Sequence, residues 1–237
     1  MYSKCARNKL RPLLLVTASV TLAGAVLTAC DSETNESTSH YQVDEKVTSL
    51  RIRTNGGNTE VVATDGPAVR VTEKFRYKDK KPHTEHVTRD GELSLNAPDC
   101  NRTGSDVCGV DYTVEVPRGI ALTVDSGGGN ITTRGLAGTM EAQSDGGNVR
   151  IRGAAMKKLS ARTGGGNLDV SFAAPPERTE TESEGGNVTV RLPKASYTVD
   201  AKTDGGNRKV DVTNAPTSPH KVTVRTSGGN ATVVTAS

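Results

Sequence analysis

Short runs in which every second residue is apolar or small recur from residue 43 to the C-terminus. Three of these runs are 122–126, 159–163 and 222–226, and the residues between the apolar positions are mostly charged or hydroxylated. Alternation with a period of two is the pattern of half-buried β-strands that keep one face in water. The sequence therefore predicts an all-β domain over residues 43–237, with no convincing helix after the first thirty residues.

A Ser/Thr-x-Gly-Gly-Asn motif divides this alternation into pairs of strands. It occurs seven times, with its asparagines at Asn58, Asn130, Asn148, Asn167, Asn187, Asn207 and Asn230, and the last six are 18, 19, 20, 20 and 23 residues apart. Glycine adopts positive φ without steric cost and asparagine tolerates it, so we expect a sharp reversal at each motif. Arg208 falls on an expected inward position, which predicts a bend or bulge in the copy at 203–212.

Two arrangements satisfy this repeat. In a β-solenoid or β-helix-like stack, successive periods lie in parallel, like residues lie over like, and the asparagines can form a hydrogen-bonded ladder. In an antiparallel meander or sandwich, each Gly-Gly-Asn would be a hairpin turn. The recurrence of the same residue classes in register over six copies favours the solenoid-like stack, in which a poorly hydrophobic chain shares one narrow core between rungs.

The segment from Tyr112 to Val124 carries a resemblance to a known family. It contains a strand ending in Val116-Pro117-Arg118-Gly119, followed by serial units of a strand, Ser/Thr-x-Gly and a second alternating strand. These features resemble the putative-adhesin β-strand-repeat domain of bacterial envelope proteins, over about residues 43–237. The resemblance implies a repetitive β fold, display at the cell surface and no established catalytic residue.

The N-terminus has the features of an export signal. Four basic residues and no acid lie in residues 1–11, and the 17 residues from Leu13 to Ala29 carry no charge. Residues 27–30, Leu-Thr-Ala-Cys, resemble the bacterial lipobox, which implies that Cys30 receives a diacylglycerol after residues 1–29 are removed. Several acyl chains make a stable membrane anchor. Residues 30–42 contain no aliphatic side chain, so they are predicted to form a flexible, lipid-anchored linker.

Export changes the interpretation of the remaining cysteines. Cys100 and Cys108 are the two thiols left after removal of the signal and acylation of Cys30, and in an oxidising compartment they are predicted to form a disulfide. A metal site that adds His83 and His86 is the alternative, but the paired C-x-x-C spacing of zinc sites is missing. We therefore predict no metal site, and whether the two cysteines are oxidised stays open.

Composition and charge exclude several functional classes. Aromatic residues are 3% of the chain and there is no tryptophan, which disfavours a deep apolar pocket and the stacking platforms of single-strand nucleic-acid binders. Four of the thirty basic residues leave with the signal, so the remaining chain has 26 bases against 27 acids and is not a nucleic-acid binder by charge. The basic cluster at residues 74–81 is expected to be a solvated strand edge. The alternative is that it contacts anionic lipid or cell-wall polymer.

The candidate catalytic and cofactor motifs have simpler explanations. Ser126 lies in an Asp-Ser-Gly-Gly sequence like that around a serine-protease nucleophile, but the same slot carries a hydroxyl in all seven copies, as a residue that bonds turn backbone would. Asp125, Asp145, Glu184 and Asp204 lie beside turns, yet other copies lack the acid that a calcium-binding β-roll repeats. We therefore predict no catalytic residue and no cofactor.

Together these features predict a lipid-anchored, non-enzymatic protein on the extracytoplasmic face of the cell membrane. Its repeat domain would serve adhesion, scaffolding or binding. The expected partners are the membrane, through lipidated Cys30, and a cell-wall polymer or an envelope protein. One alternative is an envelope-stress sensor or regulator that acts through a protein partner. A second is a glycan-active β-helix enzyme, which would need carboxylates that converge in a groove.

Overall fold

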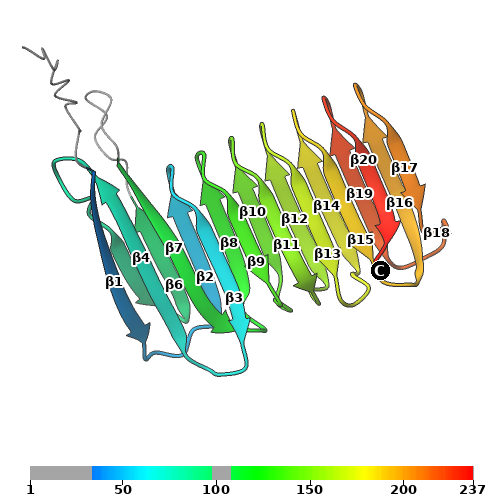
Figure 1. The fold of residues 1–237 in the computed structure, drawn as a ribbon. Coiled ribbons are helices and arrows are strands. Elements are labelled where there is room, and N and C mark those ends of the chain that lie inside the picture. Colours follow the sequence, from blue (N-terminus) through cyan, green and yellow to red (C-terminus); the bar gives the residue numbers. More distant parts are fainter. Residues whose placement is uncertain (1–33, 98–107, 237) are drawn as a thin grey trace, which may run out of the picture. The chain divides into compact units, whose positions relative to one another are not determined.

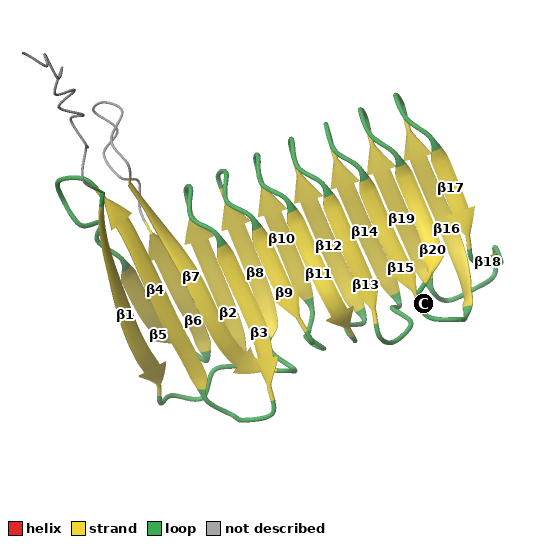
Figure 2. Cartoon of the chain, in the orientation of Figure 1, coloured by secondary structure: helices red, strands yellow, loops and turns green. Residues whose placement is uncertain are grey.

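A computed structural model describes residues 34–97 and 108–236, and all of its regular structure is β (Figure 2). Twenty strands form two sheets of ten strands each, here called sheet A and sheet B (Figure 1). In spatial order, sheet A comprises β1 (Asn35–Val43), β4 (Val69–Tyr77), β7 (Cys108–Pro117), β3 (Thr59–Thr64), β9 (Ile131–Arg134), β11 (Val149–Ala154), β13 (Leu168–Phe172), β15 (Val188–Leu192), β20 (Ala231–Thr235) and β17 (Arg208–Asp211).

Sheet B comprises, in spatial order from the opposite end, β18 (Thr213–Asn214), β16 (Ser196–Thr203), β19 (Lys221–Thr226), β14 (Arg178–Ser183), β12 (Lys158–Thr163), β10 (Met140–Ser144), β8 (Ala121–Ser126), β2 (Ser49–Thr54), β6 (Glu92–Ala97) and β5 (Glu85–Arg89). Within residues 34–97 and 108–236 there is no helix with the length and hydropathy of a membrane span.

The repeat forms a parallel stack, which confirms the solenoid prediction. Each Gly-Gly-Asn motif joins a strand of sheet B to a strand of sheet A, as β8 is joined to β9, so the turn is a corner between sheets and the hairpin alternative is wrong. Neighbouring rungs pair in parallel and in register, with Met140 beside Leu159 and Ser144 beside Thr163. Antiparallel pairing is confined, within the described strands, to β1–β4, β4–β7 and β5–β6.

The core is one narrow apolar layer between the two sheets. The inward positions of the alternating pattern are the buried ones, as in β13, where Leu168, Val170 and Phe172 are buried and the residues between them are partly exposed. Branched aliphatic side chains fill most of this layer because they suit a pleated, half-buried surface. The alternation in the sequence therefore assigns which face packs inward for most strands of the repeat.

The order of the rungs differs from the order of the chain at both ends. The β2–β3 rung lies beside the β8–β9 rung, although the chain between them forms β4 to β7. At the other end, β19 and β20 lie between the β14–β15 rung and the β16–β17 rung. The last copy of the repeat in the sequence is therefore internal, and the copy before it ends sheet A.

This rung order corrects the expectation for Arg208. β17 pairs with β20 in unbroken register, Arg208 beside Ala231 and Val210 beside Val233, so the predicted bend or bulge is wrong. Because β17 is the last strand of sheet A, Arg208 can lie exposed at the open end of the core. Its Nε donates a hydrogen bond to the carbonyl of Ala201 at 2.9 Å.

The predicted flexible linker is wrong for residues 35–42. They form β1, which pairs antiparallel with β4 over nine residues. Ser37, Ser39 and Tyr41 lie on its partly buried side, so hydroxyl groups occupy the alternate positions that aliphatic side chains fill elsewhere. The backbone of β4 supplies hydrogen-bond partners, which a composition argument based on apolar burial does not consider. Residues 1–33, including the predicted signal and Cys30, lie outside the described residues.

The glycines of the motif are required for a reason other than the predicted one. None of the Gly-Gly-Asn glycines has positive φ. Instead, a Cβ on the second glycine of each motif would lie 1.7–2.2 Å from a backbone carbonyl oxygen of the adjacent rung. The first glycine has more space, with nothing within 4 Å at Gly128 and a nearest atom at 3.9 Å from Gly146. The stacked backbones approach each other so closely that only glycine fits at the second position of each motif.

Candidate functional site

The hydroxyl that precedes each Gly-Gly-Asn belongs to the scaffold. The backbone N–H of Gly147 donates to the Ser144 hydroxyl at 2.9 Å, and that hydroxyl donates to the carbonyl of Gly129 on the neighbouring rung at 3.1 Å. Thr163 repeats the arrangement with Gly166 and Gly147. Ser126 likewise bonds to Gly129 and is buried. Its resemblance to a protease nucleophile therefore follows from turn structure.

The seven asparagines form the predicted ladder along the edge of the stack. The backbone N–H and the side-chain Nδ2 of Asn148 both donate to Oδ1 of Asn130, at 2.9 and 3.0 Å. Asn167 donates in the same way to Asn148, and Asn187 to Asn167. The ladder continues through Asn230 to Asn207, where the backbone N–H of Asn207 donates to Oδ1 of Asn230 at 2.8 Å. The ladder follows the order of the rungs in space and not the order of the asparagines along the chain.

Replacing Asn148 by Ala should lower the free energy of unfolding of the full chain by about 1–2 kcal/mol, because the two donors of Asn167 lose their acceptor and Nδ2 is removed. Urea unfolding followed by circular dichroism measures the change. Asn55 is the matched control, since this exposed turn asparagine makes no side-chain hydrogen bond within the described residues. Equal destabilisation by Asn55→Ala and Asn148→Ala would show that the ladder adds nothing to stability.

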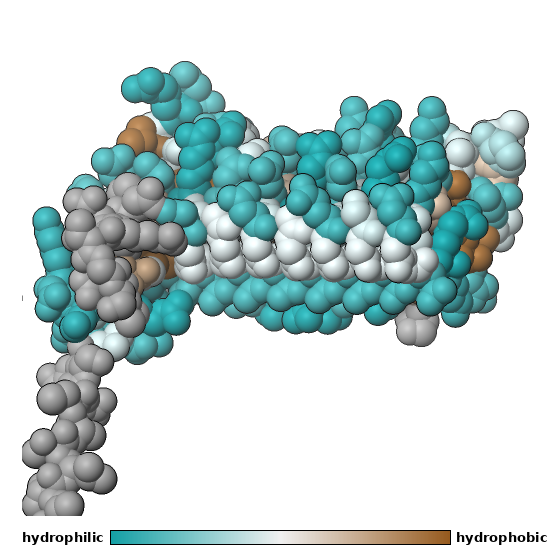
Figure 3. Space-filling view, turned by 90° about the horizontal axis from the view of Figure 1, so that it is seen from above, coloured by the Kyte–Doolittle hydropathy of each residue, from teal (hydrophilic) through white to brown (hydrophobic). Residues whose placement is uncertain are grey.

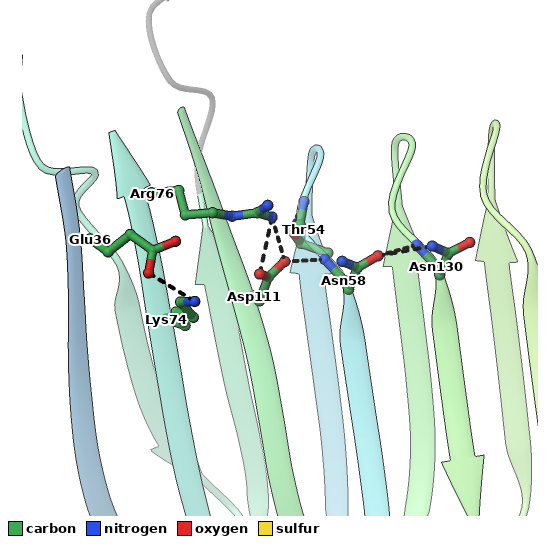
Figure 4. Close-up of polar contacts among 8 residues, drawn as sticks. Glu36, Thr54, Asn58, Lys74, Arg76, Asp111 and Asn130 are labelled. Carbon is green, nitrogen blue, oxygen red and sulfur yellow. Dashed lines mark hydrogen bonds and ion pairs between the residues drawn. The ribbon is translucent and has the colours of Figure 1, made fainter. Parts of the chain in front are cut away.

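A carboxylate begins the ladder at the junction between the parallel stack and the antiparallel strands (Figure 4). Asp111 of β7 accepts a hydrogen bond from the backbone N–H of Asn58 at 2.7 Å and from Arg76 at 3.0 Å. Asn58 in turn accepts from Asn130, at 3.0 and 3.1 Å. No sequence motif marks Asp111, because no Gly-Gly precedes it; only the pairing of β7 with β3 places it where an asparagine would stand.

An open hollow of about 520 Å³ lies on sheet A at this junction. Its lining includes Lys74, Asp111, the ladder residues Asn130 and Asn148, and two arginines, Arg134 and Arg150. The carboxylates in it are already engaged, Asp111 by Arg76 and Glu60 by Arg134. Seen from the side of the turns, the edge of the stack is pale along its centre and hydrophilic on both sides (Figure 3). The lining of the hollow is polar and includes three basic side chains, Lys74, Arg134 and Arg150.

A second polar cluster lies inside the antiparallel end of the molecule. Glu73 is only 4% exposed, and it accepts hydrogen bonds from the Tyr41 hydroxyl at 3.3 Å and the Thr84 hydroxyl at 3.2 Å. Burial first, and then the charge of Glu73, raise the pKa of Tyr41 and of Tyr112 above the ordinary value. Both tyrosines therefore stay neutral under physiological conditions, and the Tyr112 hydroxyl has no protein partner among the described residues.

The candidate metal ligands form no metal-binding group within the described part of the chain. His86 stacks on Tyr41, with ring centroids 4.5 Å apart, and no three His, Cys, Asp or Glu side chains of residues 34–97 and 108–236 lie together as metal ligands would. Cys108 begins β7, whereas Cys100 lies outside the described residues, so their disulfide stays a prediction. The turn acid Asp125 lies 3.7 Å from Arg53.

The basic cluster at 74–81 is partly neutralised by the fold. Phe75 is buried as the alternation predicts, whereas Lys74 is exposed and forms an ion pair with Glu36 at 2.9 Å. Arg76 forms an ion pair with Asp111 at 3.0 Å, and Lys81 lies 3.9 Å above the Phe75 ring. These contacts weaken the case for this segment as an independent anion site.

Comparison with known proteins finds the same architecture. A family model described as Toastrack DUF4097 matches residues 43–236. A putative cell adhesion protein from Clostridium sporogenes has a TM-score of 0.55 at 14% identity, over 86% of this chain and 100% of that one. A putative adhesin from Bacteroides fragilis has a TM-score of 0.43 at 17% identity, over 86% of this chain and 99% of that one.

A putative lipid binding protein from Parabacteroides distasonis has a TM-score of 0.35 at 12% identity, over 86% of this chain and 97% of that one. No curated protein matches the chain. At these identities the likeness to solved structures concerns the fold alone.

Proposed function

This chain belongs to the Toastrack DUF4097 family, and on that premise we propose that it is a lipid-anchored, non-enzymatic binding protein of the cell envelope. The observation that carries the proposal is that the repeated polar residues form hydrogen bonds within the scaffold. The asparagine of each copy and the hydroxyl of five copies bond to the neighbouring rungs, and the outward strand positions are left as two polar sheet faces. Such a scaffold presents an extended contact surface.

Anchoring would hold this surface close to the membrane. Because β1 begins at Asn35, only four residues separate it from Cys30. Four fully extended residues span at most about 14 Å, far less than a flexible linker ending at residue 42 would reach. The proposal therefore places the antiparallel end of the molecule next to the lipid headgroups, on the extracytoplasmic face, with the parallel stack available to a cell-wall polymer or an envelope protein.

Metabolic labelling with a fatty-acid analogue tests the anchor. The wild-type chain should become labelled and fractionate with membranes, whereas Cys30→Ala should lose the label, because an alanine offers no sulfur for acylation. Cys5→Ala is the matched control, since Cys5 would leave with the signal, and its label should equal that of the wild type. Equal labelling of the wild type and Cys30→Ala would contradict the lipid anchor.

A further inference from the structure

The outward face of sheet A carries a cationic row in which four guanidinium groups outnumber the two carboxylates that pair with them, Glu60 and Asp169. On β9, β11, β13 and β15 the outward residues include four arginines, Arg134, Arg150, Arg152 and Arg191. Asp169 is the one acid facing outward on these four strands. It contacts Arg191 and lies 3.9 Å from Arg152, so it is shared between two guanidinium groups.

Two features of this row favour the approach of an anion, although Arg134 also pairs with Glu60 of β3. Arg134 and Arg152 stand directly opposite each other on adjacent strands, and their side chains are 54% and 51% exposed. Like charges in this position repel. Arg150 stands beside Asp169 in the register, yet it makes no ion pair within the described residues.

Sheet B carries more carboxylates among its basic residues, with acids on β8, β10 and β14 where β9 and β11 have none. Most of these basic residues face a carboxylate, frequently on the next rung, as in the pairs Arg51–Glu92 at 3.3 Å, Arg162–Glu182 at 3.3 Å and Arg225–Asp200 at 3.1 Å. The same parallel register thus permits complementary charges between rungs. Their shortage on β9 and β11 is therefore not imposed by the architecture.

The cationic row adjoins the hollow and runs along the stack. Arg134 and Arg150 line the hollow together with the amides of Asn130 and Asn148. The row continues from Arg134 to Arg152 on the next rung and, beyond β13, to Arg191 on β15. Adjacent rungs are about 4.8 Å apart, so an extended ligand lying across the strands would meet guanidinium groups at several successive rungs. Guanidinium groups bind phosphate and carboxylate through paired hydrogen bonds.

We propose that the outward face of β9 and β11, with the adjoining hollow, binds a linear polymer that carries phosphate or carboxylate groups along its length. This inference rests on the proposed function, since it names the partner class of that binding surface. The exported part of the chain has 26 bases against 27 acids, so attraction by net charge does not account for such binding. No aromatic side chain faces outward on these strands, which favours such a polymer over a single-stranded nucleic acid.

Binding of the full chain in detergent to immobilised polymers tests the proposal. The probes are inorganic polyphosphate, polygalacturonate, neutral dextran and single-stranded DNA. The proposal expects binding to polyphosphate or polygalacturonate that weakens with added salt, no binding to dextran, and weaker binding to DNA. The first two probes distinguish phosphate from carboxylate recognition. Equal binding of DNA and the other anions, or no binding to either of the first two, would overturn it.

A pair of double variants locates the surface. Arg150→Gln with Arg152→Gln should weaken binding about ten-fold or more, because the unpaired guanidinium group of Arg150 and the one that shares Asp169 with Arg191 are both lost. Arg53→Gln with Arg162→Gln removes the same charge from sheet B and should leave binding unchanged. Equal losses in both would overturn the assignment to sheet A. A chain that labels with fatty acid yet binds no anionic polymer would refute this inference alone, whereas failure of labelling refutes the anchor.

Discussion

Gly147→Ala is expected to destabilise the stack by about 4 kcal/mol or to prevent folding, which is an exceptional cost for the addition of one methyl group. Its Cβ would lie 2.1 Å from the carbonyl oxygen of Gly129 and 2.9 Å from the Ser144 hydroxyl. A backbone atom held by parallel pairing on both sides cannot move away without breaking the register. Urea unfolding followed by circular dichroism at a strand wavelength measures the effect.

Gly146→Ala is the matched control for this prediction. The added Cβ would meet no atom closer than 3.9 Å, and the residue does not have positive φ. We expect a change within about 0.5 kcal/mol. If the two variants unfold at the same urea concentration, the rungs do not approach each other as closely at this corner as the structure requires.

The second large effect concerns the inserted C-terminal rung. Val233→Asp should destabilise the chain by about 4 kcal/mol, because Val233 is fully buried on β20 between β15 and β17, and a carboxylate there has no partner. Val210→Asp should cost much less, since Val210 lies partly exposed on β17 at the end of sheet A. Thermal unfolding of both variants measures the difference.

Chain order alone gives the opposite expectation. If the rungs stacked in sequence, Val210 would be internal and Val233 would lie on the last, exposed rung. A larger loss of stability in Val210→Asp than in Val233→Asp would therefore contradict the insertion of β19 and β20 between earlier rungs.

Much of the architecture can be predicted from the sequence because each repeat contains the residues that determine its own strands and turn. The alternation at 159–163 assigns the buried Leu159 and Ala161 correctly, and the recurring motif predicts the parallel stack and the asparagine ladder. These features depend on residues within one period and on the resemblance of each period to the next.

The parts that the sequence does not predict depend on contacts between distant segments. Asp111 becomes the start of the ladder only because β7 pairs with β3. Residues 35–42 form a strand only because β4 offers them a backbone edge. The cationic row is likewise invisible along the chain, since Arg134 and Arg152 are brought together by the register of two separate periods.

Binding of an anionic polymer through sheet A is the central property proposed for this envelope-anchored stack. Its most direct test extracts the full chain from native membranes and quantifies the phosphate and uronic acid that remain bound. We predict acidic polymer on the wild type and on Arg53→Gln with Arg162→Gln, and several-fold less on Arg150→Gln with Arg152→Gln. Equal amounts of polymer on all three chains, or none on the wild type, would contradict binding through sheet A.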